Sequence, residues 1–334
     1  MKVLAAPDKF RGTASAAEVA AAVARAVASC GGTAVELPMA DGGEGLLDAL
    51  GGPDRTTTVT GPLGDPVEAG WRLVDGTAVV EMAQASGLVL AGGADGNRPL
   101  DATTAGVGEL VRHAVETGAL RVIVGVGGSA TTDGGLGALE AMGPLDRYRG
   151  VELLVACDVR TPFTDAAEVF GPQKGATPAQ VRMLTGRLER LAQVYFERHG
   201  VDVSTMPRAG AAGGLAGGLA AAGAELVDGF DLVAEEVGLD VHLRDVDLVV
   251  TGEGWLDATS YEGKVVGGVE AYAAAAAVPL LVVVGGADPD VAARGDVLSL
   301  VDAYGHDRAL AESLPLLEEA VAAELARRED RAGR

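Results

Sequence analysis

Cysteine, lysine and the aromatic residues are scarce in this sequence. The two cysteines among 334 residues, Cys30 and Cys157, lie far apart and show no metal-ligand spacing, so a disulfide scaffold is not expected. Aromatic residues make up 4% of the chain while apolar residues make up 48%, so the hydrophobic content comes mostly from Ala, Val and Leu. This composition is typical of a compact α/β protein in which helices pack tightly on a sheet.

Basic residues are also few relative to acidic ones. The chain has 26 Lys and Arg against 48 Asp and Glu, which gives a formal net charge of −22. Binding to nucleic acid needs a basic face, so we do not expect nucleic acid as a partner. Solubility explains most of the acidic charge. An anionic substrate would have to be held by local positive groups, helix N-termini or a metal ion.

Neither a signal peptide nor a membrane span is expected. The N-terminus reaches Asp8 too soon for a signal peptide. The apolar run over 271–286 is split by Pro279 and is too short to cross a bilayer. We therefore expect a cytoplasmic protein that does not bind membranes.

The order of apolar runs predicts an α/β fold. Residues 1–6 are typical of a buried strand, Ser15 and Glu18 match the capping box of a following helix, and 33–37 resemble a second strand, so a parallel βαβ unit is expected. A length of 334 residues favours two domains. Residues 56–90 alternate short Thr- and Val-rich runs with glycine turns, which predicts antiparallel hairpins and the start of a second domain.

Further elements follow from periodicity and caps. A helix is predicted over 104–117, and a long helix after Thr177, which forms a capping box with Gln180. The stretches VDLVVTGEG, PLLVVVGG and VLSLVDAYG predict three more strands, the first two of the buried parallel type. The segment GAAGGLAGGLAAAG predicts a close-packed turn and helix start, because glycine permits tight backbone approach.

Glycine, acidic and hydroxyl residues recur directly after the predicted strands. Ligands of open parallel sheets bind beyond the carboxyl ends of the strands, so these loops are the candidate site. A single such loop is as compatible with an ordinary turn as with a binding site, but five such loops at one edge of a sheet favour a binding site. The candidates are Asp8, Lys9 and Arg11; Asp41, Gly42, Gly43 and Glu44; Gly127, Gly128, Ser129, Thr131 and Asp133; Asp158; and Glu253 and Asp257.

The placement of the few lysines sharpens this hypothesis. Only four of the 26 basic residues are lysine, and apart from Lys2 they lie in glycine-flanked loops, as Lys9, Lys174 and Lys264. A compact ammonium group suits phosphate or carboxylate where a broad guanidinium would not fit. We therefore favour a functional role for these three lysines over chance placement.

These parts suggest phosphoryl transfer. Asp41, Glu44 and Glu253 could hold Mg²⁺, directly or through water, and the backbone amides of 127–129 could cradle phosphate. Walker A and protein-kinase motifs are both missing, so neither common kinase class fits. A rival interpretation is a dinucleotide site at GVGGSA, although the nearest strand-end acid, Asp158, lies about thirty residues on instead of about twenty. The four histidines are scattered, so hydrolysis by an activated nucleophile is not expected.

Seven blocks together resemble the bacterial glycerate kinases of the type I family. The blocks are APDKFRGTASAAEVA, PMADGGEG, GVGGSATTDGG, VACDVRTPF, FGPQKGATPAQV, GAAGGLAGGL and TGEGWLDATSYEGK, and they occur in the family's order across nearly the whole chain. The resemblance implies a Rossmann-like parallel-sheet domain with helices on both faces, interrupted by a second, smaller α/β domain. We place the first domain at 1–60 plus 225–334 and the second at 61–224, with 103–143 open to either, and the active site in the cleft between them.

The resemblance also implies ATP- and Mg²⁺-dependent phosphorylation of D-glycerate in glycerate and glyoxylate catabolism, with 2-phosphoglycerate favoured over 3-phosphoglycerate. On this basis we expect Lys9, Asp41 and Asp257 to be catalytic, the last two as candidate bases. The expected substrate contacts are Asp8, Lys9, Arg11, Ser129 and Asp133. The expected nucleotide and phosphate contacts are Gly127, Gly128, Lys174, Gly252, Gly254 and Lys264. The expected metal ligands are Asp41, Glu44 and Glu253.

The sequence departs from the family pattern in four places. Arg11 stands where lysine is common, Trp255 where arginine is common, and Thr259 where glutamine is usual, and the segment from Met142 to Val151 is shorter than in most relatives. These departures leave the reaction class intact. A monomer or homodimer is expected. The alternatives are an NAD(P)-dependent dehydrogenase of a small hydroxy acid and a non-catalytic sensor of small acids.

Overall fold

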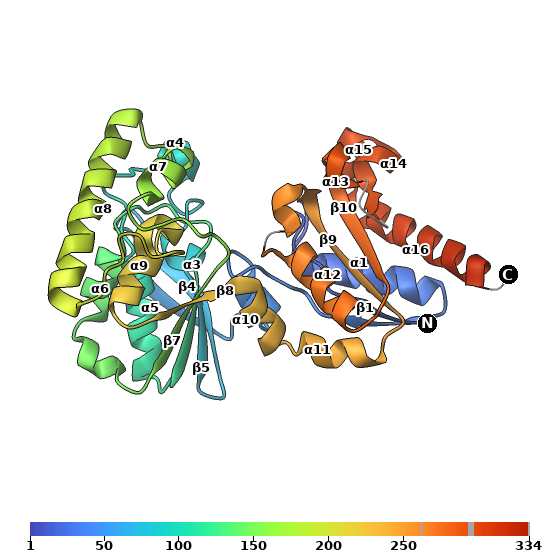
Figure 1. Ribbon diagram of the computed structural model, residues 1–334, viewed down its shortest axis with the longest axis horizontal. Coiled ribbons are helices and arrows are strands. Elements are labelled where there is room, and N and C mark those ends of the chain that lie inside the picture. Colours follow the sequence, from blue (N-terminus) through green and yellow to red (C-terminus); the bar gives the residue numbers. More distant parts are fainter. Residues whose placement is uncertain (262, 293–296, 333–334) are drawn as a thin grey trace. The chain divides into compact units, whose positions relative to one another are not determined.

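The computed structural model describes residues 1–261, 263–292 and 297–332 (Figure 1). The chain forms two compact units, each of which is built from a sheet and helices. Unit 1 contains Met1–Asp41, Asp48–Leu50 and Phe230–Arg334, and unit 2 contains Gly42–Leu47 and Gly51–Gly229. The predicted fold class is therefore confirmed. The interrupting unit spans more residues than unit 1, whereas the sequence led us to expect a smaller insert.

Unit 1 is organised around a parallel five-stranded sheet of order β11-β10-β9-β1-β2. The predicted βαβ opening is confirmed: Lys2 pairs with Thr33 and Ala5 with Glu36. The strands are β1 (Lys2–Ala5), β2 (Thr33–Glu36), β9 (Leu248–Leu256), β10 (Leu280–Ala287) and β11 (Val297–Ser299).

Helices cover both faces of this sheet. Two separate apolar clusters lie against it, one containing Val23 of α1 and Leu317 of α16, the other containing Val266 of α12. The Ser15–Glu18 capping box is present at the start of α1. The helices of unit 1 are α1 (Ala16–Ser29), α10 (Gly229–Glu236, whose first residue falls in unit 2), α11 (Leu239–His242), α12 (Val265–Ala275), α13 (Pro289–Ala292), α14 (Leu300–Tyr304), α15 (His306–Ala311) and α16 (Ser313–Ala332).

One predicted strand of unit 1 is shorter than expected. Of the stretch VLSLVDAYG, only Val297–Ser299 is extended, and the remainder forms α14. The Ser299 hydroxyl accepts a hydrogen bond from the backbone N–H of Asp302, so this serine caps the helix and ends the strand. A serine followed by an acidic residue three positions on was the local signal for this cap.

Unit 2 contains a mixed six-stranded sheet of order β3-β4-β5-β6-β7-β8. The β3–β4 and β4–β5 pairs are antiparallel, as predicted for 56–90, and the remaining pairs are parallel. Because β3 pairs with β4, unit 2 begins its main segment at Gly51 and not near residue 61, and 103–143 lies within it. The strands are β3 (Arg55–Thr60), β4 (Pro66–Val74), β5 (Thr77–Glu81), β6 (Arg121–Gly125), β7 (Glu152–Cys157) and β8 (Glu225–Asp228).

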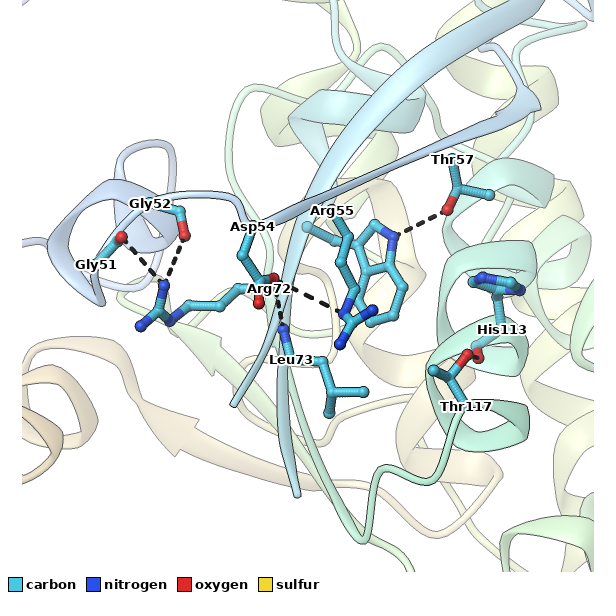
Figure 2. A network of polar contacts seen from close by, with 10 residues as sticks. Gly51, Gly52, Asp54, Arg55, Thr57, Arg72, Leu73, His113 and Thr117 are labelled. Atoms are coloured by element: carbon cyan, nitrogen blue, oxygen red, sulfur yellow. Dashed lines mark hydrogen bonds and ion pairs between the residues drawn. The ribbon is translucent and has the colours of Figure 1, made fainter. Parts of the chain in front are cut away.

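A polar network fixes the β3–β4 hairpin (Figure 2). The buried Trp71 donates its indole N–H to the Thr57 hydroxyl, with the Arg55 guanidinium 5.5 Å from the ring centroid. The Arg72 guanidinium donates to the carbonyls of Gly51 and Gly52 at 3.2 Å each. These contacts tie the hairpin to the segment that enters the sheet.

The helices of unit 2 begin largely where their caps predict. Helix α8 starts after the Thr177–Gln180 capping box, and the predicted 104–117 helix is α5. The glycine-rich segment forms the predicted tight turn, because a Cβ at Gly213 would lie 2.0 Å from the Thr131 carbonyl oxygen. The helices are α3 (Ala83–Ser86), α4 (Gly93–Gly96), α5 (Ala105–Glu116), α6 (Leu136–Met142), α7 (Ala166–Phe170), α8 (Pro178–His199) and α9 (Leu215–Ala221), while α2 (Leu46–Ala49) begins in unit 2 and ends in unit 1. Within the described ranges, none of the helices has the length and apolarity to cross a membrane.

Candidate active site

The sheet of unit 1 has a topological switch point between β1 and β9. From β1 the chain moves through α1 to β2 on one side, and from β9 it moves through α12 and β10 to β11 on the other. The two crossover helices belong to different apolar clusters, as expected for helices on opposite faces. Ligands of open α/β sheets bind in the crevice at the carboxyl ends of the strands at such a point. The loops after β1 and β9 therefore form the best candidate site of this unit.

The loop after β1 is held rigidly by its own backbone and by β9. The backbone N–H of Asp8 donates to the Gly252 carbonyl at 2.8 Å, and Phe10 forms a bridge with Ala14 just before α1. The Lys9 backbone N–H donates to Asp8 Oδ1 at 2.7 Å, and its ammonium lies 3.6 Å from the same oxygen. The loop thus presents Lys9 from a fixed backbone.

Two glycines within β9 let three backbone segments approach one another. A Cβ at Gly252 would lie 1.7 Å from the Val283 carbonyl oxygen of β10. A Cβ at Gly254 would lie 3.0 Å from the Arg11 backbone nitrogen. Larger residues would push the strand ends apart, so we infer that these two predicted phosphate contacts act in the packing of the site.

Four carboxyl groups of unit 1 influence one another electrostatically. Burial raises the pKa of Glu253 to about 7, and the negative charges of Asp8 and Asp257 add to that effect while Lys264 opposes it. Burial also raises the pKa of Asp8 to about 6, against the lowering effect of Lys9 and with a further rise from Asp41. The described surroundings of Glu253 Oε1 contain no hydrogen-bond partner. Such a cluster favours a bound cation or positively charged ligand group.

Asp257 is used differently from its neighbours. Its Oδ1 accepts hydrogen bonds from the Thr259 backbone N–H at 2.7 Å, the Thr259 hydroxyl at 2.6 Å and the Ser260 N–H at 3.1 Å. These bonds, led by that from the Thr259 hydroxyl, lower the pKa of Asp257. Lys264 Nζ donates to the same hydroxyl at 3.1 Å. The carboxylate therefore stabilises the turn at Ala258–Tyr261 and orients Lys264 through Thr259.

In unit 2, the loop after β6 packs on the loop that contains Glu44. A Cβ at Gly127 would lie 2.7 Å from the Glu44 backbone nitrogen, and one at Gly128 would lie 3.6 Å from Glu44 Oε2. The Glu44 loop is itself fixed by Glu81, whose Oε2 accepts the N–H groups of Gly45 and Leu47. The structure thus brings Glu44, Gly127 and Gly128 together. Glu81 ends a strand in the sequence, and nothing near it indicated this role.

Asp133 lies inside unit 2 and is occupied by protein donors. Its carboxylate accepts the Thr104 N–H at 2.9 Å, the Thr104 hydroxyl at 2.8 Å, and the N–H groups of Gly135 and Gly137. Burial raises the pKa of this carboxyl despite those bonds. Asp133 therefore fixes the turn after Ser129, which is itself 9% exposed and bridges to Gly87.

Lys174 is 2% exposed, unlike the other loop lysines. Its Nζ donates to the Thr131 carbonyl at 2.6 Å, and Asn97 donates to the carbonyls of Ala130 and Lys174 at 2.9 Å each. Burial lowers the pKa of Lys174 to about 7, while Asp133 opposes that shift. Lys174 and Asn97 together hold the loop over 129–133. Sequence reasoning missed Asn97 and Thr104 because they lie far from this loop along the chain.

The residues available for a divalent ion are few. The described part of the chain has no group of three or more Asp, Glu, His or Cys side chains already arranged as a metal site. Mg²⁺ is commonly bound by one or two carboxylates, with the remaining ligands from water and phosphate. The orphaned Glu253 Oε1 and the clustered Asp8 and Asp41 fit that mode.

Comparison with known proteins gives one consistent family. The sequence pattern described as the Glycerate kinase family matches residues 3–145 and 144–327, two pieces that meet where the sequence predicts a shortened loop. Glycerate 2-kinase of Escherichia coli K12 is 39% identical over 87% of each chain, and Glycerate kinase of Bacillus subtilis is 40% identical over 87% of this chain and 86% of its own. The crystal structure of putative glycerate kinase 2 from Salmonella typhimurium LT2 has a TM-score of 0.80 at 33% identity and covers 99% of both chains. The chain therefore belongs to the glycerate kinase family and is a kinase.

Proposed function

We propose that this chain transfers the γ-phosphoryl group of ATP, with Mg²⁺, to the 2-hydroxyl of D-glycerate and so forms 2-phosphoglycerate for glycerate catabolism. Phosphorylation of glycerate by a nucleotide-dependent kinase follows from the family. The observation that carries the finer proposal is the cluster of Asp8, Asp41 and Glu253 with Lys9 and Lys264 beside the switch point. It combines opposite charges at the place where this sheet type binds ligands.

The lysine loop is assigned to the acid substrate. Lys9 and Arg11 follow β1 in a loop fixed to β9, so two cations are available to pair with the glycerate carboxylate. Asp8 orients the Lys9 ammonium from 3.6 Å.

The metal is assigned to Glu253, whose Oε1 has no hydrogen-bond partner among the described residues. Mg²⁺ bound there would neutralise phosphate charge and orient the triphosphate. Lys264, positioned by Thr259, would pair with a phosphate oxygen. We propose that Lys174 and Asp133 act through the loop they hold, because both are engaged with protein groups.

Of the two candidate bases, Asp41 is favoured over Asp257. Hydrogen bonds lower the pKa of Asp257 and commit its Oδ1 to the turn, which makes it a poor proton acceptor. We expect Asp41→Asn to lower kcat at least tenfold. Asp257→Asn should change kcat less than threefold when the rate is expressed per folded enzyme. A larger kcat loss in Asp257→Asn than in Asp41→Asn would reverse the assignment.

The deciding experiment measures ADP release over a panel of small hydroxy acids. D-Glycerate is expected to give the highest kcat/KM, and ³¹P NMR of the product should show phosphate on the 2-hydroxyl. Lys9→Ala should raise the glycerate KM at least tenfold, while Lys2→Ala, a lysine at the chain terminus, should change nothing. Glycerate binding without ADP release would instead indicate a sensor, and reduction of a nicotinamide cofactor would indicate a dehydrogenase.

A further inference from the structure

A small hollow in unit 1 lies beside the proposed phosphate and metal residues. It has a volume of about 70 Å³ and is lined at the strand ends by Arg11, Gly254, Trp255 and Gly286. Phe10 and Leu310 are among its apolar walls. Two of the lining residues, Gly254 and Trp255, directly follow Glu253 in β9. The hollow therefore adjoins the crevice at the switch point between β1 and β9.

The Trp255 indole beside this hollow is both fixed by contacts and half exposed to solvent. Half of the residue is exposed, although its N–H donates to Asp288 Oδ1 at 3.0 Å. A Cβ at Gly286 would lie 2.4 Å from the indole, so the ring packs directly on the Gly286 backbone. The ring is thus fixed in place by its edge and by the contact with Gly286, while half of its surface stays open.

We propose that the nucleobase of the nucleotide lies over the mouth of this hollow, which is too small to enclose a purine, and stacks on the exposed part of Trp255. This inference rests on the proposed function, which supplies a nucleotide at the same sheet edge. A fixed, exposed aromatic ring is the surface on which bases stack, and alkyl and glycine walls suit the faces of a flat heterocycle.

The chain offers a direct optical test. It has two tryptophans, and Trp71 is 1% exposed and lies in unit 2, so a ligand-dependent emission change should come from Trp255. Adenosine and inorganic tripolyphosphate are the probes. Adenosine should quench and shift the emission, and tripolyphosphate at the same concentration should leave it unchanged. A response to tripolyphosphate alone, or to neither probe, would overturn the proposal.

Kinetics of matched variants give a second test. Trp255→Ala should raise the KM for ATP about tenfold, or about 1.4 kcal/mol of binding, with the glycerate KM and kcat within twofold. Trp255→Phe keeps a ring and should stay within threefold of wild type while losing the adenosine-dependent emission change. Phe196→Ala, an exposed aromatic on α8, is the control and should match wild type in both tests.

The two readouts separate this inference from the proposed function. If the enzyme phosphorylates glycerate but Trp255→Ala has a normal KM for ATP, the base lies elsewhere and the kinase assignment stands. If adenosine quenches Trp255 but glycerate is not phosphorylated, the base site stands and the substrate assignment fails. Should Trp255→Ala not fold, the wild-type titration with adenosine and tripolyphosphate still decides.

Discussion

Replacement of Lys174 by Met should remove a pH dependence from the stability of the protein. The lysine is fully buried, and burial lowers its pKa from the ordinary 10.5 to about 7. The unfolded chain keeps this proton up to about pH 10.5, whereas the folded protein loses it near pH 7. Between these values the unfolded state binds more protons, so the free energy of unfolding rises with pH.

The size of the effect follows from the shift. Each pH unit between the two pKa values changes the free energy of unfolding by about 1.4 kcal/mol, so Lys174 should add roughly 3–4 kcal/mol between about pH 7 and pH 10. Lys174→Met keeps most of the side-chain volume but has no titrating group. It also leaves the Thr131 carbonyl without the ammonium donor, at a cost of about 1–3 kcal/mol. The gap between wild type and variant should therefore widen as the pH rises.

The assay is urea unfolding at a series of pH values, with the slope and midpoint fitted at each. Other titrating groups are present in both proteins, so the difference between wild type and variant isolates Lys174. Lys2→Met, at the chain terminus, should show the wild-type pH dependence. Parallel curves for wild type and Lys174→Met between pH 7 and pH 10 would refute the assignment of a neutral buried lysine.

The other predictions concern packing and the carboxylate cluster. Gly252→Ala should lower the free energy of unfolding by about 2 kcal/mol or more, because its Cβ would overlap the Val283 carbonyl. Gly186→Ala, in open space on α8, should raise the free energy of unfolding by about 0.5–1 kcal/mol. Thermal denaturation of both variants checks these two predictions. Since burial raises the pKa of Glu253 to about 7, a proton competes with a metal ion below that pH. Mg²⁺ should therefore raise Tm more at pH 8 than at pH 6, and Glu253→Gln should abolish the difference; an unchanged Mg²⁺ response in that variant would exclude Glu253 as a ligand.

The features that could be predicted from the sequence are those fixed by neighbouring residues. The capping boxes at Ser15 and Thr177, the antiparallel hairpins over 56–90 and the glycine turn before α9 all depend on contacts a few residues apart. Asp257 also belongs to this class, because an acid followed by Thr259 and Ser260 is a local signal for a turn cap. The turn-capping role of Asp257 could therefore have been predicted from the sequence, but the family resemblance led us to expect a catalytic base there.

The roles that could not be predicted depend on contacts between distant segments. Lys174 reaches the Thr131 carbonyl across 43 residues, and Asn97 reaches the Lys174 carbonyl across 77. Glycine-flanked lysines look alike in sequence whether the ammonium faces a ligand or a carbonyl. Only burial separates Lys174 from Lys9, and burial is set by the fold of the whole unit.

The contrast between these lysines explains how a strongly acidic protein can handle an anionic substrate. Lys9 stays beside Asp8 with part of its side chain exposed, so its charge remains available at the sheet edge. Lys174 is buried and fixes the loop that carries Ser129 through its bond to the Thr131 carbonyl. Because burial lowers its pKa to about 7, Lys174 loses its charge near neutral pH. A buried lysine that need not stay charged can hold this loop without adding a permanent positive charge to it. The local charge of the loop after β1, which we propose to bind the substrate, is then set by Lys9 and Arg11, whatever the net charge of the protein.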